Sequence, residues 1–226
     1  MKQVIHFLRQ AVVKLPFTLT LLITVGGVAL LTDSHNGRLH PAWLQRLGFA
    51  AQDMAAGRWE RLFSSAVTTH GGSVFWQAMG MTAVAVGTAE WLTGSKRTAL
   101  TFWGIHLLTL SLESSLVTPF LHQFANVDAL QVARDVGPSA GYFGCLGLVV
   151  WQLPRRWRMA VGLTILAGLL LTLWRPLRVD ETAELKLLAD VAHLLAFSLG
   201  FLSTPFFLPF RRFPREWSVL KGASRW

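Results

Sequence analysis

Apolar residues gather in six long runs that short polar segments separate, and this pattern predicts the architecture. The runs cover residues 15–31, 73–92, 99–121, 138–153, 159–174 and 187–210, of which the fourth is short. A helix that crosses a bilayer needs about 20 mostly apolar residues. We therefore predict an all-α polytopic membrane protein with six transmembrane helices, organised as a single membrane domain over residues 1–226.

The first run follows basic residues and so has the layout of a secretory signal. It is long, no small-x-small cleavage site follows it, and more apolar runs come later, so we interpret it as a retained helix. The longest polar stretch, residues 33–72, holds tryptophan, phenylalanine and leucine among charged residues. Amphipathic segments of this kind commonly lie in the membrane interface.

The composition supports a membrane protein and excludes two other classes. The chain is 52% hydrophobic and only 15% charged, whereas soluble domains carry about a quarter charged residues. A disordered chain would be poor in apolar residues. A soluble globule would need more polar surface than this chain supplies. The single cysteine, Cys145, excludes an intrachain disulfide.

The positive charge is distributed unevenly along the chain, and its distribution predicts the orientation. With the N-terminus inside, 13 of the 21 basic residues fall in the inner segments, namely the N-terminus, the turns at 96–97 and 155–158, and the tail after residue 210. Lys and Arg collect in cytoplasmic loops. We therefore expect a multi-pass protein of the cell (inner) membrane with both termini cytoplasmic. The net charge of +9 then needs no nucleic-acid partner, and the lipid bilayer is the expected surrounding.

Ionisable side chains inside a bilayer are costly, which makes the few that occur there candidates for function. Within the predicted helices they are His106 and Glu113 in the third and His193 in the sixth. For Glu113 a structural hydrogen bond is the simplest interpretation, beside a place near an active site or a role in proton transfer. Asp190 precedes His193 by three residues and is expected to cap the sixth helix or to face water.

The glycine-rich segment 137–144 surrounds one serine, and glycines there let neighbouring helices approach closely. Pro138 suits the first turn of a helix, so we expect Ser139 about one turn inside the fourth helix. His193 shares a face of the sixth helix with small residues at helical spacing. Both helices run from outside to inside, so Ser139 and His193 should lie at similar shallow depths and can form a nucleophile–base pair. Taken singly, a packing serine and an interior histidine are the simpler interpretations.

These residues stand in motifs that resemble the rhomboid family of intramembrane serine proteases. Gly137-Pro138-Ser139 resembles the family's Gly-x-Ser motif at the start of its fourth core helix, and residues 192–196 resemble its Ala-His-x-x-small motif in the sixth. Upstream, three segments are similar in order to the family's first loop, second-helix start and cytoplasmic turn, namely residues 57–64, 70–72 and 90–97. The rhomboid-like core would cover about residues 57–210.

The resemblance implies a serine endopeptidase that cleaves transmembrane protein substrates near the outer leaflet, with Ser139 as nucleophile and His193 as general base. It implies no cofactor, and the chain lacks His-Glu-x-x-His or comparable ligand spacing, so we expect no metal. The family often has an aromatic residue four positions past the serine, stacked on the histidine. The residues expected to pack near the site are Phe143, Gly141, Ala192, Ala196 and Gly200.

The chain departs from the family at the side chains that stabilise the oxyanion. Many rhomboids place a second His and an Asn where this chain has Phe75 and Met79, neither of which can donate a hydrogen bond. Losing one such donor costs about 100- to 1000-fold in rate. The groups that could substitute for them or support the site belong to Gly137, His70, Gln77 and Glu113.

Two other functions remain open on the sequence. A catalytically inactive rhomboid-like protein that binds membrane clients would explain the missing oxyanion donors. A small-solute or proton-coupled transporter would use Glu113 and His106 of one helix, although the chain shows neither paired broken helices nor internal pseudo-symmetry.

Overall fold

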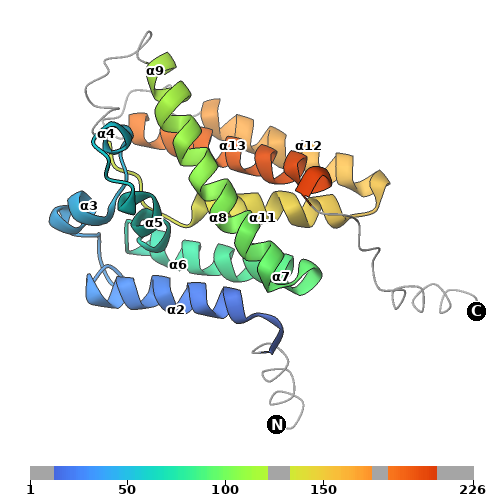
Figure 1. Cartoon of the computed structure of the whole chain (residues 1–226), viewed down its shortest axis with the longest axis horizontal. Helices are drawn as coiled ribbons and strands as arrows, with labels where there is room; N and C mark the ends of the chain where they lie inside the picture. The colour runs from blue at the N-terminus through green and yellow to red at the C-terminus, as the bar shows by residue number, and fades with distance from the viewer. Residues whose placement is uncertain (1–12, 122–132, 175–182, 208–226) are drawn as a thin grey trace, which may run out of the picture.

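The protein is all-helical in the part of the chain that the structure describes (Figure 1). The structure is a computed structural model, and it describes residues 13–121, 133–174 and 183–207. The helices are α2 (Pro16–Leu31), α3 (Pro41–Leu47), α4 (Ala51–Ala55), α5 (Glu60–Val67), α6 (Ser73–Met81), η1 (Thr82–Val86), α7 (Gly87–Thr93), α8 (Ser95–Leu112), η2 (Glu113–Val117), α9 (Thr118–Leu121), α11 (Ser139–Gln152), α12 (Arg155–Trp174) and α13 (Ala183–Phe207).

Each of the six predicted apolar runs coincides with one helical rod. The second run is α6, η1 and α7 in succession, and the third is α8, η2 and α9, so each of these rods contains one π-helical turn. The last run extends to residue 210, of which residues 208–210 lie outside the described ranges. The prediction of an all-α protein is therefore confirmed.

Within the described ranges, three helical stretches are long and apolar enough to cross a membrane, namely Ser95–Phe120, Arg155–Leu173 and Lys186–Ser203. The apolar helix Pro16–Leu31 is shorter. Only 11% of the most apolar window of α12 is buried within the protein, and leucines such as Leu163 and Leu171 face outward. Apolar surface of this extent is disfavoured in water. Length, composition and exposure together indicate a membrane protein.

Helix α11 packs between α8 and α13, and its small residues allow these close approaches. A Cβ atom on Gly141 would collide with the ring of Phe102 in α8, and one on Gly144 would lie 2.7 Å from Ile105. Toward α13, a Cβ on Gly200 would collide with the carbonyl oxygen of Gly144. These glycines therefore allow the backbones of α8 and α13 to approach the backbone of α11 closely, as their spacing in the sequence predicts.

The short helices α3, α4 and α5 gather at the end of the bundle where α11 begins (Figure 1). The fully buried carboxylate of Asp53 in α4 accepts hydrogen bonds from Arg134 (2.6 Å), Arg61 (2.8 Å) and the Ala50 N–H (3.0 Å). Burial alone would raise the pKa of Asp53, but the two guanidinium groups and the N–H outweigh it and hold the pKa below its ordinary value. This carboxylate ties the first loop to the segment that leads into α11.

At the opposite end of the bundle, a buried glutamate caps another helix. Glu90 of α7 accepts hydrogen bonds from the N–H groups of Phe17 (2.9 Å) and Thr18 (2.7 Å) and from the Thr18 hydroxyl (2.6 Å). The N-cap residue of α2, Leu15, offers no side-chain cap of its own. The Glu90 carboxylate therefore satisfies N–H groups that the first turn of α2 leaves without partners.

Candidate active site

Ser139 is the first residue of α11, with Pro138 as its N-cap. The prediction that Ser139 lies about one turn inside the helix is therefore wrong. Gly137 has a φ of +152°, a backbone conformation that glycine adopts readily and other residues rarely do. This conformation is not helical, so the helix cannot extend through Gly137 toward the N-terminus. The Gly137 N–H donates to the carbonyl of Ser65 in α5 at 2.9 Å, which fixes the turn before the serine.

The start of α11 at Ser139 directs backbone donors toward the serine. The first N–H groups of a helix have no intrahelical partner, and they carry the positive end of its dipole. Tyr142 is the first residue of α11 whose N–H donates a helical hydrogen bond, and the acceptor is the carbonyl oxygen of Pro138. The N–H groups of Ser139 and the two residues after it are therefore suited to bind a negative oxygen.

His193 lies on α13 against the same helix. Its imidazole ring contacts the ring of Phe143, with centroids 4.6 Å apart and planes inclined by 34°. Phe143 is one turn after Ser139, so both side chains lie on one face of α11. The buried residues Ala140 and Ala196 pack together at this same contact between α11 and α13. The structure thus brings the serine-bearing face of α11 and the histidine-bearing face of α13 together.

No direct hydrogen bond joins the Ser139 hydroxyl to the His193 ring, both of which belong to the described residues. The His193 side chain is 21% exposed, and Ser139 is also half-buried. Catalytic hydrogen bonds are often long in an enzyme without its substrate and tighten in the substrate complex. The structure therefore shows no formed donor–acceptor pair between the Ser139 hydroxyl and the His193 imidazole.

Asp190 does not cap α13, which was one of the two positions predicted for it. Helix α13 begins at Ala183, so Asp190 is two turns inside the helix and does not cap it. Its Oδ1 lies 3.9 Å from Nδ1 of His193. A carboxylate beside Nδ1 favours the tautomer whose Nε2 can accept a proton from a hydroxyl. The sequence signal was the three-residue spacing to His193, which places both residues on one helical face.

The residues proposed to replace the oxyanion donors are scattered. Gln77 is on the exposed side of α6, and half-buried His70 lies in the turn before α6, where its carbonyl accepts the Leu39 N–H at 2.9 Å. Phe75 is buried in the hydrophobic core, and Met79 packs against that core. Of the four candidates, Gly137 adjoins the serine, and Glu113 lines a pocket near it.

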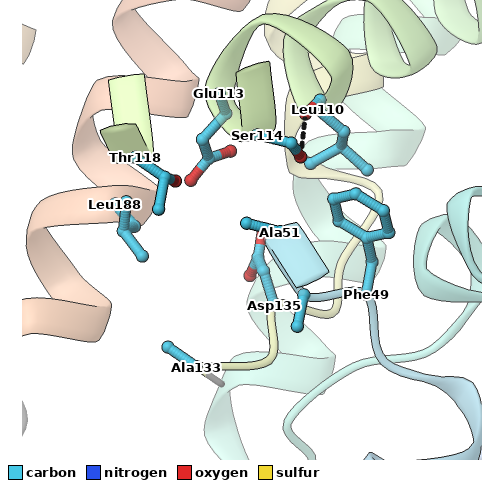
Figure 2. A pocket seen from close by; sticks show the side chains of 10 residues that line it. Phe49, Ala51, Leu110, Glu113, Ser114, Thr118, Ala133, Asp135 and Leu188 are labelled. Atoms are coloured by element: carbon cyan, nitrogen blue, oxygen red, sulfur yellow. Dashed lines mark hydrogen bonds between the residues drawn. The ribbon is translucent and has the colours of Figure 1, made fainter. Parts of the chain in front are cut away.

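This pocket lies between η2, the first loop and α13, and Figure 2 shows its lining. Its acidic residues are Glu113 and Asp135, and its larger apolar residues are Phe49, Leu110 and Leu188. Asp135 was not among the site residues predicted from the sequence. Its position four residues before Ser139 was the available signal.

Comparisons with protein-family models, with curated proteins and with solved structures found no match to this chain. The candidate site consists of Ser139, His193 and the pocket at Glu113 and Asp135. They offer a hydroxyl at a helix N-terminus, an imidazole on the neighbouring helix and an acidic pocket beside them.

Proposed function

We propose that the protein is an intramembrane serine endopeptidase of the rhomboid type, which cleaves membrane-protein substrates near the outer leaflet. The observation that carries the proposal is the contact between Phe143 and His193, one helical turn from Ser139. It supports the pairing of Ser139 as nucleophile with His193 as general base. The ordered motifs of the sequence support the same pairing.

In the proposed reaction, His193 accepts the hydroxyl proton of Ser139 while the serine oxygen attacks a substrate carbonyl. The negative oxygen of the tetrahedral intermediate is stabilised by the N–H groups of the first turn of α11. The intermediate collapses to an acyl-enzyme, and protonated His193 gives its proton to the leaving amine. Water then hydrolyses the ester with His193 again as base, which restores the serine.

The proposal includes six membrane crossings with both termini cytoplasmic. Three helical stretches have the length and apolar character of spans, and α2, α6–α7 and α11 lie beside them in the same bundle. This layout puts the N-terminus of α11 on the outer side, where water can reach Ser139. A reporter fused after Trp226 should report a cytoplasmic location, and an extracytoplasmic signal would contradict the layout.

One observation favours a second candidate, a rhomboid-like protein that binds membrane clients without cleaving them. The position where many rhomboids carry the second histidine holds Phe75, which is buried among core residues and offers no donor. In this candidate Ser139 and His193 would serve packing alone. The two candidates differ in whether Ser139 reacts as a nucleophile.

Fluorophosphonate labelling of the purified full chain distinguishes them, because the probe forms a covalent bond only with an activated serine. The proposal expects labelling of the wild type that disappears in both Ser139→Ala and His193→Ala. Ser64→Ala is the matched control, because this hydroxyl donates to the Leu47 carbonyl and should not affect labelling. A folded wild type that stays unlabelled would favour the client-binding protein.

A further inference from the structure

We infer that the pocket between Glu113 and Asp135 is a subsite that binds a basic side chain of the substrate, a lysine or an arginine. The inference rests on the proposed function, since it assigns a specificity to the same site. It is carried by the placement of two carboxyl groups at the wall of one open, partly apolar pocket (Figure 2).

Glu113 is the stronger of the two observations. Its side chain is only 7% exposed, and its Oε2 atom is buried without a hydrogen-bond partner. Glu113 is the first residue of the π-helical turn η2, and Figure 2 shows its carboxyl group directed into the pocket. π-helical turns inside α-helices occur frequently at functional sites. A buried polar atom without a partner is unfavourable, and a donor that enters the pocket would satisfy it.

Asp135 supplies a second carboxyl group from a different part of the chain. Its backbone pairs with Phe49 in both directions, through hydrogen bonds of 3.0 and 2.8 Å, which holds the residue in place. The side chain is half-buried and lies within electrostatic range of Glu113. A cation that enters between the two carboxyl groups would stabilise their ionised forms.

The remaining lining favours an organic cation over a metal ion. Phe49, Leu110 and Leu188 offer apolar walls, which suit the alkyl stem of a long basic side chain. Metal sites in proteins take four or more ligands, and in the described part of the chain no cluster of three or more His, Cys, Asp or Glu residues occurs. The Ser114 hydroxyl at the pocket already donates to the Leu110 carbonyl at 2.7 Å.

The pocket is within reach of the proposed site of cleavage. Asp135 precedes Ser139 by four residues, and Leu188 precedes His193 by five residues of one helix, about 7.5 Å along its axis. Asp135 also interacts electrostatically with His193. A substrate whose scissile bond lies at Ser139 would therefore place a neighbouring side chain in the pocket.

Binding of short peptides to the full-length Ser139→Ala variant tests the subsite without catalysis. The probes are pairs of fluorescent hexapeptides. One member of each pair has arginine at a chosen position, and the other has citrulline, its neutral isostere, at the same position. A series of such pairs tests each position of the peptide in turn. Fluorescence anisotropy gives the dissociation constants. At one position arginine should bind about tenfold more tightly, as expected for a charged hydrogen bond. Adding Glu113→Gln should remove most of this preference, and adding Asp135→Asn should reduce it.

Glu60→Gln is the matched control, because it removes one negative charge from an exposed position and should leave the preference intact. If Glu113→Gln does not keep its helical circular dichroism, Asp135→Asn alone decides. Equal binding of arginine and citrulline at every position, or a preference that survives both substitutions, would overturn the subsite. Fluorophosphonate labelling of Ser139 in the parent chain separates the two claims. Labelling without an arginine preference rejects only the subsite, whereas a Glu113-dependent preference without labelling supports the cation site and rejects the protease.

Discussion

The imidazole ring of His193 lies 4.6 Å, centroid to centroid, from the ring of Phe143, which joins α13 to α11 one turn from Ser139. An aromatic contact of this kind contributes free energy beyond simple burial and restricts how the imidazole can turn. The orientation of the proposed general base therefore depends on a residue that takes no part in proton transfer.

Replacing this ring should slow the proposed reaction without abolishing it. Phe143→Ala removes the contact that holds His193, and we expect the rate of fluorophosphonate labelling to fall about two- to tenfold, the value of one aromatic pair. Phe143→Tyr keeps the ring and should retain most of the rate. An unchanged labelling rate in folded Phe143→Ala would show that the ring does not position the base.

The close approach of α11 and α13 predicts that a single methyl group at their crossing is harmful. In Gly200→Ala the new Cβ would collide with the Gly144 carbonyl, so the helices must separate. We expect a loss of about 1–3 kcal/mol in the free energy of unfolding, together with slower labelling of Ser139. Thermal unfolding in detergent, followed by circular dichroism, measures the first effect.

Gly168→Ala in α12 provides the control, since no atom lies within 4 Å of its Cβ position. An alanine there should stabilise the helix by about 0.5–1 kcal/mol, because glycine in a helix interior is unfavourable. Equal free energies of unfolding for the two alanine variants would contradict the prediction that the close packing at Gly200 excludes a methyl group.

The cap that Glu90 provides for α2 predicts a large effect at the opposite end of the bundle. Glu90→Ala removes a buried carboxylate that accepts three hydrogen bonds, and we expect a loss of about 3 kcal/mol in stability. Thr18→Val keeps the shape and removes only the hydroxyl bond, so its cost should be smaller, about 1–2 kcal/mol. Unfolding temperatures of the two variants in one detergent measure the difference, and equal losses would contradict a capping role.

The Asp53 carboxylate predicts how stability depends on pH. Its pKa is below the ordinary value of 3.8 in the folded protein, so the unfolded chain binds the proton more readily. The stabilisation is therefore complete above about pH 4 and is lost as the pH falls through the lower, folded pKa. The unfolding temperature of the wild type should fall on acidification by more than that of Asp53→Asn.

At neutral pH, Asp53→Asn should be destabilised by about 3–5 kcal/mol, because it leaves the buried guanidinium of Arg134 without its carboxylate. The exposed Asp33, replaced in Asp33→Asn, is the control for the change in net charge. Parallel pH profiles for the wild type and Asp53→Asn would contradict the assignment of the pH effect to this carboxylate.

The sequence was sufficient to locate the six apolar helices, because long apolar runs leave the backbone few other ways to satisfy its hydrogen bonds, but it did not locate the short helices α3, α4 and α5. It also singled out the small residues of α11 and α13, where glycine spacing indicates close packing. It could not predict the pocket, because Glu113 and Asp135 come from distant segments, and the backbone pairing of Asp135 with Phe49 that holds one of them in place is encoded by no local pattern.

Two other misjudged features have local physical causes. Asp190 was predicted either to cap the sixth helix or to face water. Helix α13 begins at Ala183, before the apolar run, so Asp190 lies inside the helix beside His193 and does not cap it. Ser139 was predicted about one turn inside the fourth helix, but it is the first residue of α11, because the positive φ of Gly137 keeps the helix from extending further toward the N-terminus. Apolar periodicity marks where a helix is buried, not where its backbone begins.

The most direct test of the account is the site of the covalent fluorophosphonate adduct, located by mass spectrometry of the labelled full-length protein. The account predicts an adduct on Ser139 in the wild type and in Phe143→Tyr, and none in His193→Ala. An adduct on any other serine, or a folded wild type that carries none, would contradict the assignment of Ser139 and His193 as a catalytic pair.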